Sequence, residues 1–421
     1  MSTAGRDVFR APIGTRDVLP PESLRWQELV ARFAVRAGRA GFGLLVTPMF
    51  EHLEVVQKLG STTDVVRKEL YDFTDKGARA LALRADGTAS VVRAYVQHRP
   101  SVPWKVWYVA PNFRYERPQK GRYRQHWQVG VEVLGVDDPA VDVEVMALAH
   151  GLYQDLGLRR YRLAINSMGD AESRQRYRDV LLQYWRAHSD LLGDEMARAE
   201  ANPMRILDSK REDWQDMVER APQIGEYLSD DAARQFEQVE EGLQALGISF
   251  EIAPRLVRGL DYYTGTTFEF ASDALDAAQN AIGGGGRYDR LSEDMGGPAT
   301  AGIGFGIGIE RVLIACDSEV VFDEPVASTD VFVVDAVGGV EALVLLEELR
   351  ALGVRADRAY GARKFGKQMA AADKSGARFA VIIGEKERAA GTVGVKDMVS
   401  GHQSDHPRDQ APAWLKLQLD A

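Results

Sequence analysis

The chain has 421 residues, a length that predicts roughly two to four domains, and its 45% hydrophobic and 27% charged residues are typical of globular proteins. The single cysteine, Cys316, excludes an internal disulfide framework and a zinc site with several cysteine ligands. The net charge of −10 argues against a protein that coats nucleic acid through bulk charge, although it allows a local basic surface.

The chain carries no signal for a membrane or for secretion. No window approaches the roughly 20 apolar residues that span a bilayer, and the N-terminal segment lacks the apolar core of a secretory signal. The 7 histidines are scattered, so we assign no metal site formed by protein side chains. These features predict a multidomain protein of the cytoplasm without a membrane partner.

The first part of the chain alternates helical and extended patterns. Apolar residues recur at helical spacing over 21–40, after two prolines and before a glycine. The apolar run 44–49 contains Pro48, which favours an edge or broken strand. Further elements are predicted as strands over 80–87, 105–116 and 125–135, the last two forming an antiparallel pair, and as a helix over 138–156.

The second part begins with a highly charged stretch of helical periodicity, about 168–250, which predicts a helical insertion. Strand signals return over 255–270, and glycine clusters follow at 283–291 and 302–313. The polar stretch 317–330 is typical of a linker. Strands and helices then alternate, with helices over 340–351 and 365–375 and strands over 379–384 and 392–398. We therefore expect one domain over 1–325 and a small α/β domain over 326–421.

Charged residues gather where strand 105–116 ends. Arg114 and Glu116 lie two residues apart, so they point to the same side of the predicted strand. The adjoining loop adds four cations that suit a polyanion: Arg117, Lys120, Arg122 and Arg124. A solvated hairpin with cross-strand ion pairs explains the same residues, and for the loop taken alone it is the better-supported interpretation.

The returning strand places Gln128, Gly130 and Glu132 at alternate positions, hence on one face. An amide and a carboxylate separated by a glycine leave space in which an ammonium group fits. An exposed polar face of an antiparallel sheet is an equally good interpretation.

The segment GIGFGIGIERV has glycine at 302, 304, 306 and 308, which strips one face of a strand of side chains and allows a flat ligand to approach. Glu310 and Arg311 follow at a predicted helix start. Neither a GxGxxG fingerprint in its strand–turn–helix context nor a GxxxxGK[ST] loop occurs, so a nucleotide would bind on an open antiparallel sheet. Close packing of the strand against a helix is the alternative.

Two further segments carry candidate residues. RGLDYY places Arg258 near Tyr262 and Tyr263, and RADGTAS places Asp86 and Thr88 at a strand end. The RGLDYY segment is weak alone, because tyrosines commonly fill cores with a satisfied hydroxyl.

Taken together, these segments resemble the three motifs of class II aminoacyl-tRNA synthetases: a long helix with a proline-containing strand, FRxE on a hairpin, and a glycine-alternating strand that ends in ER. RGLDYYTGTTFEF, GGGGRYDRL, PIGTRDVLP and FRYERPQKGRYRQ resemble the histidyl-tRNA synthetase family in particular, over nearly the whole chain. The resemblance implies an α+β catalytic core on a six-stranded antiparallel sheet, a helical insertion and a C-terminal α/β anticodon-binding domain. It implies a homodimeric ligase that activates L-histidine with ATP, accompanied by Mg²⁺, and transfers the histidyl group to tRNA(His).

The resemblance also implies roles for single residues. Arg114 and Arg258 match catalytic arginines that hold the α-phosphate. The implied ATP site comprises Arg114, Glu116, Arg122, His126, Glu310 and Arg311. The implied histidine site also includes Arg114 and Arg258. In it, Thr88, Gln128 and Glu132 hold the α-ammonium end, and Asp86 and Tyr263 recognise the imidazole, with Tyr262 beside them. The implied tRNA contacts are Arg117 and Gln119 at the acceptor end and Arg363, Lys364 and Lys367 in the C-terminal domain.

Two positions depart from the family pattern: Asp86 stands where glutamate is usual in bacterial enzymes, and His126 where a phenylalanine commonly packs on adenine. Two rival functions stay open. One is a non-catalytic, synthetase-like regulatory subunit of ATP phosphoribosyltransferase, a class that usually lacks the C-terminal domain and some of the arginines. The other is a class II ligase for another amino acid, against which RGLDYY argues.

Overall fold

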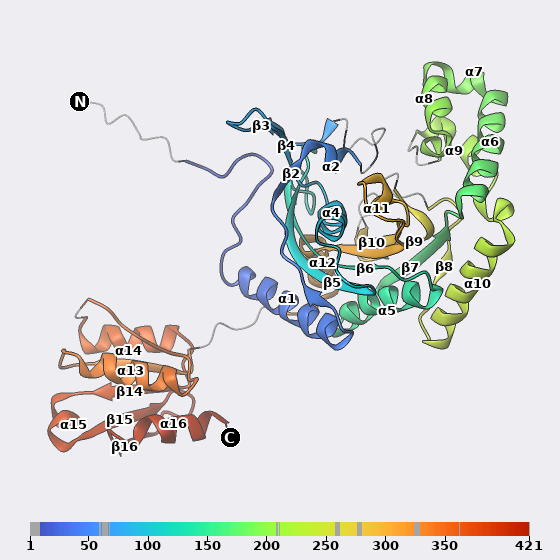
Figure 1. Cartoon of the computed structure of the whole chain (residues 1–421). Coiled ribbons are helices and arrows are strands. Elements are labelled where there is room, and N and C mark those ends of the chain that lie inside the picture. The colour runs from blue at the N-terminus through green and yellow to red at the C-terminus, as the bar shows by residue number, and fades with distance from the viewer. Residues whose placement is uncertain are drawn as a thin grey trace, which may run out of the picture. The chain divides into compact units, whose positions relative to one another are not determined.

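The computed structural model describes residues 9–58, 60, 66, 68–207, 209, 211–256, 262–275, 280–323, 329–361 and 363–420. The chain divides into two units, Met1–Glu324 and Pro325–Ala421 (Figure 1). In the part of the chain that is described, no helix combines the length and apolar character needed to cross a bilayer.

An eight-stranded sheet organises the first unit, with the strand order β1-β5-β6-β11-β10-β9-β7-β8. Its strands are β1 (Gly43–Leu44), β5 (Trp104–Phe113), β6 (Gln125–Leu134), β7 (Tyr161–Ser167), β8 (Glu251–Ile252), β9 (Thr264–Ser272), β10 (Ala281–Arg287) and β11 (Gly302–Gly308). The six long strands are antiparallel, and the two-residue strands β1 and β8 run parallel to their neighbours at the two edges. The predicted six-stranded antiparallel core is thus confirmed, with a short strand added at each edge.

One face of this sheet is buried against four helices. These are α1 (Glu22–Arg39), α5 (Pro139–Asp155), α10 (Asp230–Ala245) and α12 (Ile309–Glu319), which with the sheet form the largest apolar core. Side chains at alternate strand positions enter this core, among them Val129 and Val131 of β6 and Phe305 of β11, all at most 2% exposed. Each such buried side chain contributes about 1.5–3 kcal/mol. The positions between them face the other way and are left for polar residues and glycine.

The opposite face is covered near β5 by α2 (Leu53–Gln57), α4 (Thr88–His98), α11 (Leu291–Asp294) and a three-stranded sheet of β2 (Phe50–His52), β4 (Ala80–Leu83) and β3 (Asp72–Thr74). The strand predicted over 80–87 therefore stops at Leu83. The buried guanidinium of Arg84 donates to Pro111 O at 2.7 Å and to Thr47 Oγ1 at 2.9 Å, which fixes the following segment without strand pairing. The predicted strand 44–49 likewise shrinks to the edge strand β1, and helix α4 was not predicted.

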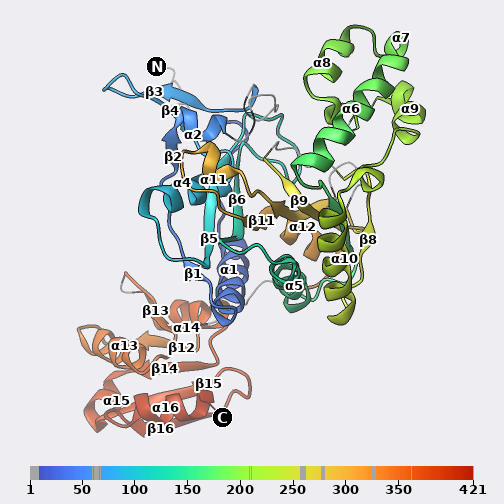
Figure 2. The same cartoon turned by 45° about the vertical axis from the view of Figure 1, so that its right-hand side comes forward.

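Helices fill most of the predicted insertion, with α6 (Ala171–Ala187), α7 (Ser189–Leu192), α8 (Met196–Ala201), α9 (Gln215–Glu219) and four short 3₁₀ turns, Gly193–Glu195, Pro203–Ile206, Glu212–Trp214 and Ile224–Tyr227. They enclose their own core around Trp185, Tyr177 and Trp214. Both views show α6–α9 standing away from the large sheet (Figures 1 and 2). The last helix of the predicted stretch, α10, belongs instead to the core beneath the sheet, because its Val239 and Leu243 are buried there.

The second unit contains a five-stranded sheet in the order β13-β12-β14-β15-β16, in which β13, β12 and β14 are parallel and β15 and β16 antiparallel. Its strands are β12 (Val331–Asp335), β13 (Ala356–Arg358), β14 (Phe379–Ile383), β15 (Thr392–Asp397) and β16 (Gln403–Pro407). Its helices are α13 (Glu341–Ala351), α14 (Phe365–Lys374), α15 (Glu385–Ala390) and α16 (Ala411–Asp420). The predicted α/β alternation is confirmed, although β13, α15, β16 and α16 were missed. Of the predicted linker 317–330, residues 317–319 are the end of α12, and 324–328 lie outside the described residues.

Candidate functional site

The candidate site lies on the sheet face that the helices α1, α5, α10 and α12 leave open. Here Glu132, Gly130 and Gln128 of β6 pair with Gly304, Gly306 and Gly308 of β11. A Cβ atom on Gly304 would overlap the Glu132 carboxylate, one on Gly306 would lie 3.1 Å from Gln128 Oε1, and one on Gly308 would meet nothing within 4 Å. These glycines face polar side chains and open space, so packing against a helix does not explain them.

A cavity of about 300 Å³ opens over the glycine-rich strands β10 and β11. Its lining includes all six residues of the predicted ATP site: Arg114, Glu116, Arg122, His126, Glu310 and Arg311. Gln128 and Glu269 line the same cavity. Tertiary structure thus brings together a loop, two strand ends and the start of a helix. The first and last of these residues, Arg114 and Arg311, are almost 200 positions apart in the sequence.

The arginines of this cavity are oriented by backbone carbonyls. Arg114 Nε donates to Ala85 O at 3.0 Å, and Arg311 donates to Gly121 O at 3.2 Å and to Ala281 O at 2.9 Å. Arg122 forms an ion pair with Glu116. Strand β5 ends at Phe113, so Arg114 and Glu116 lie beyond the strand that was predicted to present them, yet both still line the cavity.

Part of the solvated-hairpin interpretation holds for the loop between β5 and β6. Arg124 stacks on Tyr115 with its guanidinium carbon 3.8 Å from the ring centroid, and its Nε donates to Glu116 O at 3.2 Å. Arg117, Gln119 and Lys120 are exposed. Two of the four loop cations, Arg122 and Arg124, are therefore engaged within the loop, and two extend into solvent.

Two titratable groups of the cavity have shifted pKa values. Burial and the nearby guanidinium groups of Arg114, Arg311 and Arg122 lower the pKa of His126 to about 3, so its imidazole is neutral at pH 7. Burial raises the pKa of Glu310 to about 7, and its carboxylate accepts the Trp127 N–H at 3.0 and 3.1 Å. Glu310 therefore fixes the start of β6 as well as lining the cavity.

A second polar cluster surrounds the carboxyl group of Glu132, which is fully buried. Thr88 Oγ1 donates to it at 2.7 Å, Tyr288 OH at 2.5 Å and Tyr108 OH at 3.5 Å. Burial raises the pKa of Glu132 to about 8. The interpretation of Glu132 as part of an exposed polar sheet face is therefore wrong.

Tyr108 and Tyr288 were missed as site residues. A Cβ atom on Gly130 or Gly87 would overlap the Tyr108 ring, and one on Gly302 would overlap the Tyr288 ring. Both tyrosines thus lie where glycines of neighbouring segments make room for them. Tyr288 belongs to GGGGRYDRL, one of the segments that carry the family resemblance, but the resemblance assigned no role to this side chain.

Asp86 and the paired tyrosines converge beside Glu132. Tyr262 OH donates to Asp86 Oδ2 at 3.2 Å across 176 positions of sequence, and Ala89 N donates to Asp86 Oδ1 at 3.2 Å. The rings of Tyr262 and Tyr263 lie 4.6 Å apart between centroids. Burial raises the pKa of Asp86. Arg258 falls in 257–261, outside the described residues, so its predicted convergence with Arg114 stays a prediction.

The predicted tRNA-contacting cations of the second unit, Arg363, Lys364 and Lys367, are exposed around the start of α14. Two neighbouring arginines are engaged instead, Arg355 with Asp330 at 2.6 Å and Arg358 with Asp335 at 3.9 Å. Among the described residues, no group of three or more His, Cys, Asp or Glu side chains could hold a metal ion.

Comparison with known proteins identifies relatives over the full length. Residues 14–312 match the family model described as histidyl-tRNA synthetase, and residues 330–418 match one described as an anticodon binding domain. The chain is 48% identical to the histidine–tRNA ligase of Geobacillus kaustophilus (strain HTA426), over 97% of this chain and 98% of that protein.

Solved structures extend the comparison. The structure of apo S. aureus histidyl-tRNA synthetase superposes with a TM-score of 0.83 at 35% identity, covering 97% of this chain and 100% of that chain. A Bacillus halodurans protein described as an ATP phosphoribosyltransferase regulatory subunit/histidyl-tRNA synthetase has a TM-score of 0.65 at 22% identity, covering 89% of this chain and 99% of that chain. At that identity the second likeness shows the fold alone.

Proposed function

The chain belongs to the histidyl-tRNA synthetase family, and from this premise we propose that it is a class II ligase that joins L-histidine to tRNA(His) with the use of ATP. In the first step the histidine carboxylate attacks the α-phosphorus of ATP, which yields histidyl-adenylate and pyrophosphate. In the second step the histidyl group passes to the terminal ribose of the tRNA. The observation that carries this proposal is a buried cluster of acids and tyrosines beside an arginine-lined cavity on one open sheet face.

We propose that this acid–tyrosine cluster lines the pocket that binds histidine. Glu132, Thr88 and Gln128 would hold the α-ammonium end, and Asp86 with Tyr262 and Tyr263 would hold the imidazole. Among the described residues, each Asp86 oxygen accepts one protein donor, which leaves each a lone pair for a ring N–H. A buried pocket that hydrogen-bonds both ring nitrogens rejects isosteres that lack them by about 10⁴–10⁵, which removes the need for a proofreading site.

We propose that the arginine-lined cavity binds ATP, with Arg311 on the γ-phosphate and Arg114 on the α-phosphate. Two anions meet in the first step, so the barrier is largely electrostatic and positional. The contact from Arg114 Nε to Ala85 O supports its role, because Ala85 directly precedes Asp86 and ties this guanidinium to the histidine pocket. By family resemblance, Arg258 would approach the same phosphorus. Loss of one such donor costs about 2.7–4 kcal/mol, or 10²–10³ in rate.

The surroundings of His126 keep its imidazole neutral at pH 7. The neutral imidazole of His126 can stack on adenine without adding a positive charge beside Arg114 and Arg311.

Magnesium would enter with the phosphates, and the carboxylates of Glu269 and Glu116 in the cavity lining are oxygen ligands of the kind it accepts. When bound, it would neutralise negative charge that develops on the pyrophosphate group. No protein base is required for the histidine carboxylate, which is already ionised at pH 7.

The remaining proposals concern partners. Arg117 and Gln119, exposed on the loop between β5 and β6, would contact the acceptor end of tRNA(His), and Arg363, Lys364 and Lys367 its anticodon arm. We also propose a homodimer in the cytoplasm, formed through α1. In support, a groove of about 700 Å³ runs between α1 and α5 and includes the exposed Val35.

Histidine-dependent exchange of pyrophosphate into ATP tests the function directly. The ligase predicts exchange with L-histidine and none with the other amino acids as controls. The regulatory-subunit alternative predicts no exchange with any amino acid, and a ligase of other specificity predicts exchange with a different one. The C-terminal unit and the match over 330–418 favour the ligase over the regulatory subunit.

A further inference from the structure

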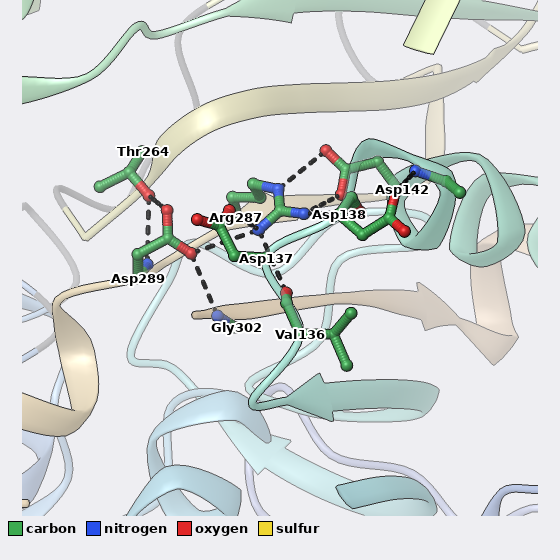
Figure 3. A network of polar contacts seen from close by, with 9 residues as sticks. Val136, Asp137, Asp138, Asp142, Thr264, Arg287, Asp289 and Gly302 are labelled. Carbon is green, nitrogen blue, oxygen red and sulfur yellow. Dashed lines mark hydrogen bonds and ion pairs between the residues drawn. The ribbon is translucent and has the colours of Figure 1, made fainter. Parts of the chain in front are cut away.

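Three successive residues at the end of β10, Arg287, Tyr288 and Asp289, make polar contacts with different parts of the fold. Tyr288 enters the candidate histidine pocket, where its hydroxyl donates to Glu132 Oε2 at 2.5 Å and its ring meets Tyr262 edge-on at 6.0 Å between centroids. Its neighbours Arg287 and Asp289 face each other, with Arg287 Nη1 3.5 Å from Asp289 Oδ1 (Figure 3). Because adjacent residues share a backbone, whatever fixes these neighbours also fixes Tyr288.

Arg287 is anchored to the connection between β6 and α5. Its guanidinium donates to Asp142 Oδ2 at 3.0 Å and to Asp138 O at 2.9 Å, and it approaches Asp142 Oδ1 at 2.8 Å (Figure 3). Arg287 is 4% exposed and Asp142 is 1% exposed. Asp138 in turn caps α5 by accepting from Ala140 N at 2.8 Å. A bidentate, buried contact of this kind restricts both position and orientation.

Asp289 is anchored to the strands on either side. Its Oδ1 accepts from Gly302 N at 3.1 Å at the start of β11, and its Oδ2 accepts from Thr264 Oγ1 at 3.0 Å at the start of β9 (Figure 3). The Thr264 hydroxyl also accepts from Asp289 N at 3.1 Å. Thr264 directly follows Tyr262 and Tyr263. The reciprocal pair of hydrogen bonds therefore joins two walls of the candidate pocket.

We propose that Arg287, Asp289 and Thr264 are positioning residues for histidine binding, which hold Tyr288 against Glu132 and the Tyr262–Tyr263 segment beside Asp86. The inference rests on the proposed function and deepens it, since none of the three side chains is assigned a contact with a substrate. A pocket whose walls are held before binding loses less conformational freedom when the ligand enters. None of these three residues lines the candidate ATP cavity. Loss of their hydrogen bonds should therefore weaken the binding of histidine rather than that of ATP.

Thr264→Val tests the inference, with Thr264→Ser as the matched variant that keeps the hydroxyl. Valine has nearly the same shape, removes both hydrogen bonds to Asp289 and leaves one of its carboxylate oxygens without this partner. In pyrophosphate exchange we expect Thr264→Val to raise the KM for histidine about 5- to 30-fold and to change the KM for ATP by less than about twofold. Thr264→Ser should restore the wild-type KM for histidine. Equal rises in both KM values, or an unchanged KM for histidine, would overturn the inference.

Arg287→Lys provides a second test that keeps the charge but not the bidentate geometry. Its control is Arg162→Lys on β7, which changes an exposed arginine paired with Glu251 at 3.0 Å. We expect a selective rise in the KM for histidine for the first variant alone. Wild-type protein without histidine-dependent exchange would contradict the proposed function itself. Wild-type activity with no selective effect in Thr264→Val or Arg287→Lys would contradict only the positioning role.

Discussion

The buried carboxyl group of Glu132 makes the stability of the first unit depend on pH. Its pKa rises from the ordinary value of 4.5 to about 8, chiefly through burial, with Asp86 adding to the rise. Hydrogen bonds from Tyr288, Thr88 and Tyr108 oppose the rise. Between these two pKa values the folded protein retains a proton that the unfolded chain has lost. Stability contributed by this group is therefore present below pH 4.5 and is lost as pH rises toward 8.

The magnitude follows from the two pKa values. Linkage between pH 5 and pH 7 gives a loss of about 2–3 kcal/mol in the free energy of unfolding from Glu132 alone. Glu132→Gln keeps the shape of the protonated carboxyl group but does not titrate. The free energy of unfolding of the variant, minus that of the wild type, should therefore rise by about 2–3 kcal/mol between pH 5 and pH 7. At any single pH, the difference in the free energy of unfolding between variant and wild type also includes the effect of changed hydrogen bonds. The prediction therefore concerns how this difference changes with pH.

Urea unfolding followed by tryptophan fluorescence measures this slope. Six of the 7 tryptophans lie before residue 325, so the signal reports chiefly on the first unit. Glu251→Gln, at an exposed carboxylate on β8, serves as the control and should run parallel to the wild type. Parallel curves for the wild type and Glu132→Gln between pH 5 and pH 7 would refute the reasoning.

The same titration governs histidine binding if the ionised carboxylate receives the α-ammonium group. The ionised fraction of Glu132 rises about fivefold between pH 7 and pH 8, where the imidazole of free histidine stays neutral. We expect the KM for histidine to fall by about that factor while the KM for ATP stays level. A KM for histidine that is independent of pH in this range would separate Glu132 from ammonium binding.

Three further predictions concern the site and the C-terminal unit. Asp86→Ala should raise the KM for histidine far more than that for ATP in pyrophosphate exchange, and equal effects would contradict the pocket assignment. Gly304→Ala should abolish histidine binding in calorimetry, because its Cβ would overlap the Glu132 carboxylate. Gly308→Ala should leave histidine binding intact, because a Cβ there would meet nothing within 4 Å. Equal losses in the two variants would contradict the geometry. Replacing Arg363, Lys364 and Lys367 together by alanine should raise the KM for tRNA about tenfold and leave exchange unchanged, and full charging would exclude this surface.

Local patterns were sufficient for long elements with a strong period. The limits of α1, α5, α13 and α14 fall within about two residues of those predicted, because amphipathic helices with proline or glycine at their ends carry their boundaries in the sequence. Short elements were less predictable. The run 80–87 becomes a four-residue strand because the buried guanidinium of Arg84 takes over the following segment, a contact with Pro111 that no local pattern encodes.

Residue types and spacing in the sequence determined which chemical groups the site offers: glycine at alternate positions of β11, an amide and a carboxylate four residues apart on β6, and arginines at 114 and 311. Only the tertiary structure decided that Glu132 is buried among three hydroxyl groups, that Tyr108 and Tyr288 supply two of them, and that Asp86 meets Tyr262. The reason is physical. Strand periodicity tells which residues share a face, but burial and pKa depend on what other segments lay over that face, and those segments are distant in sequence.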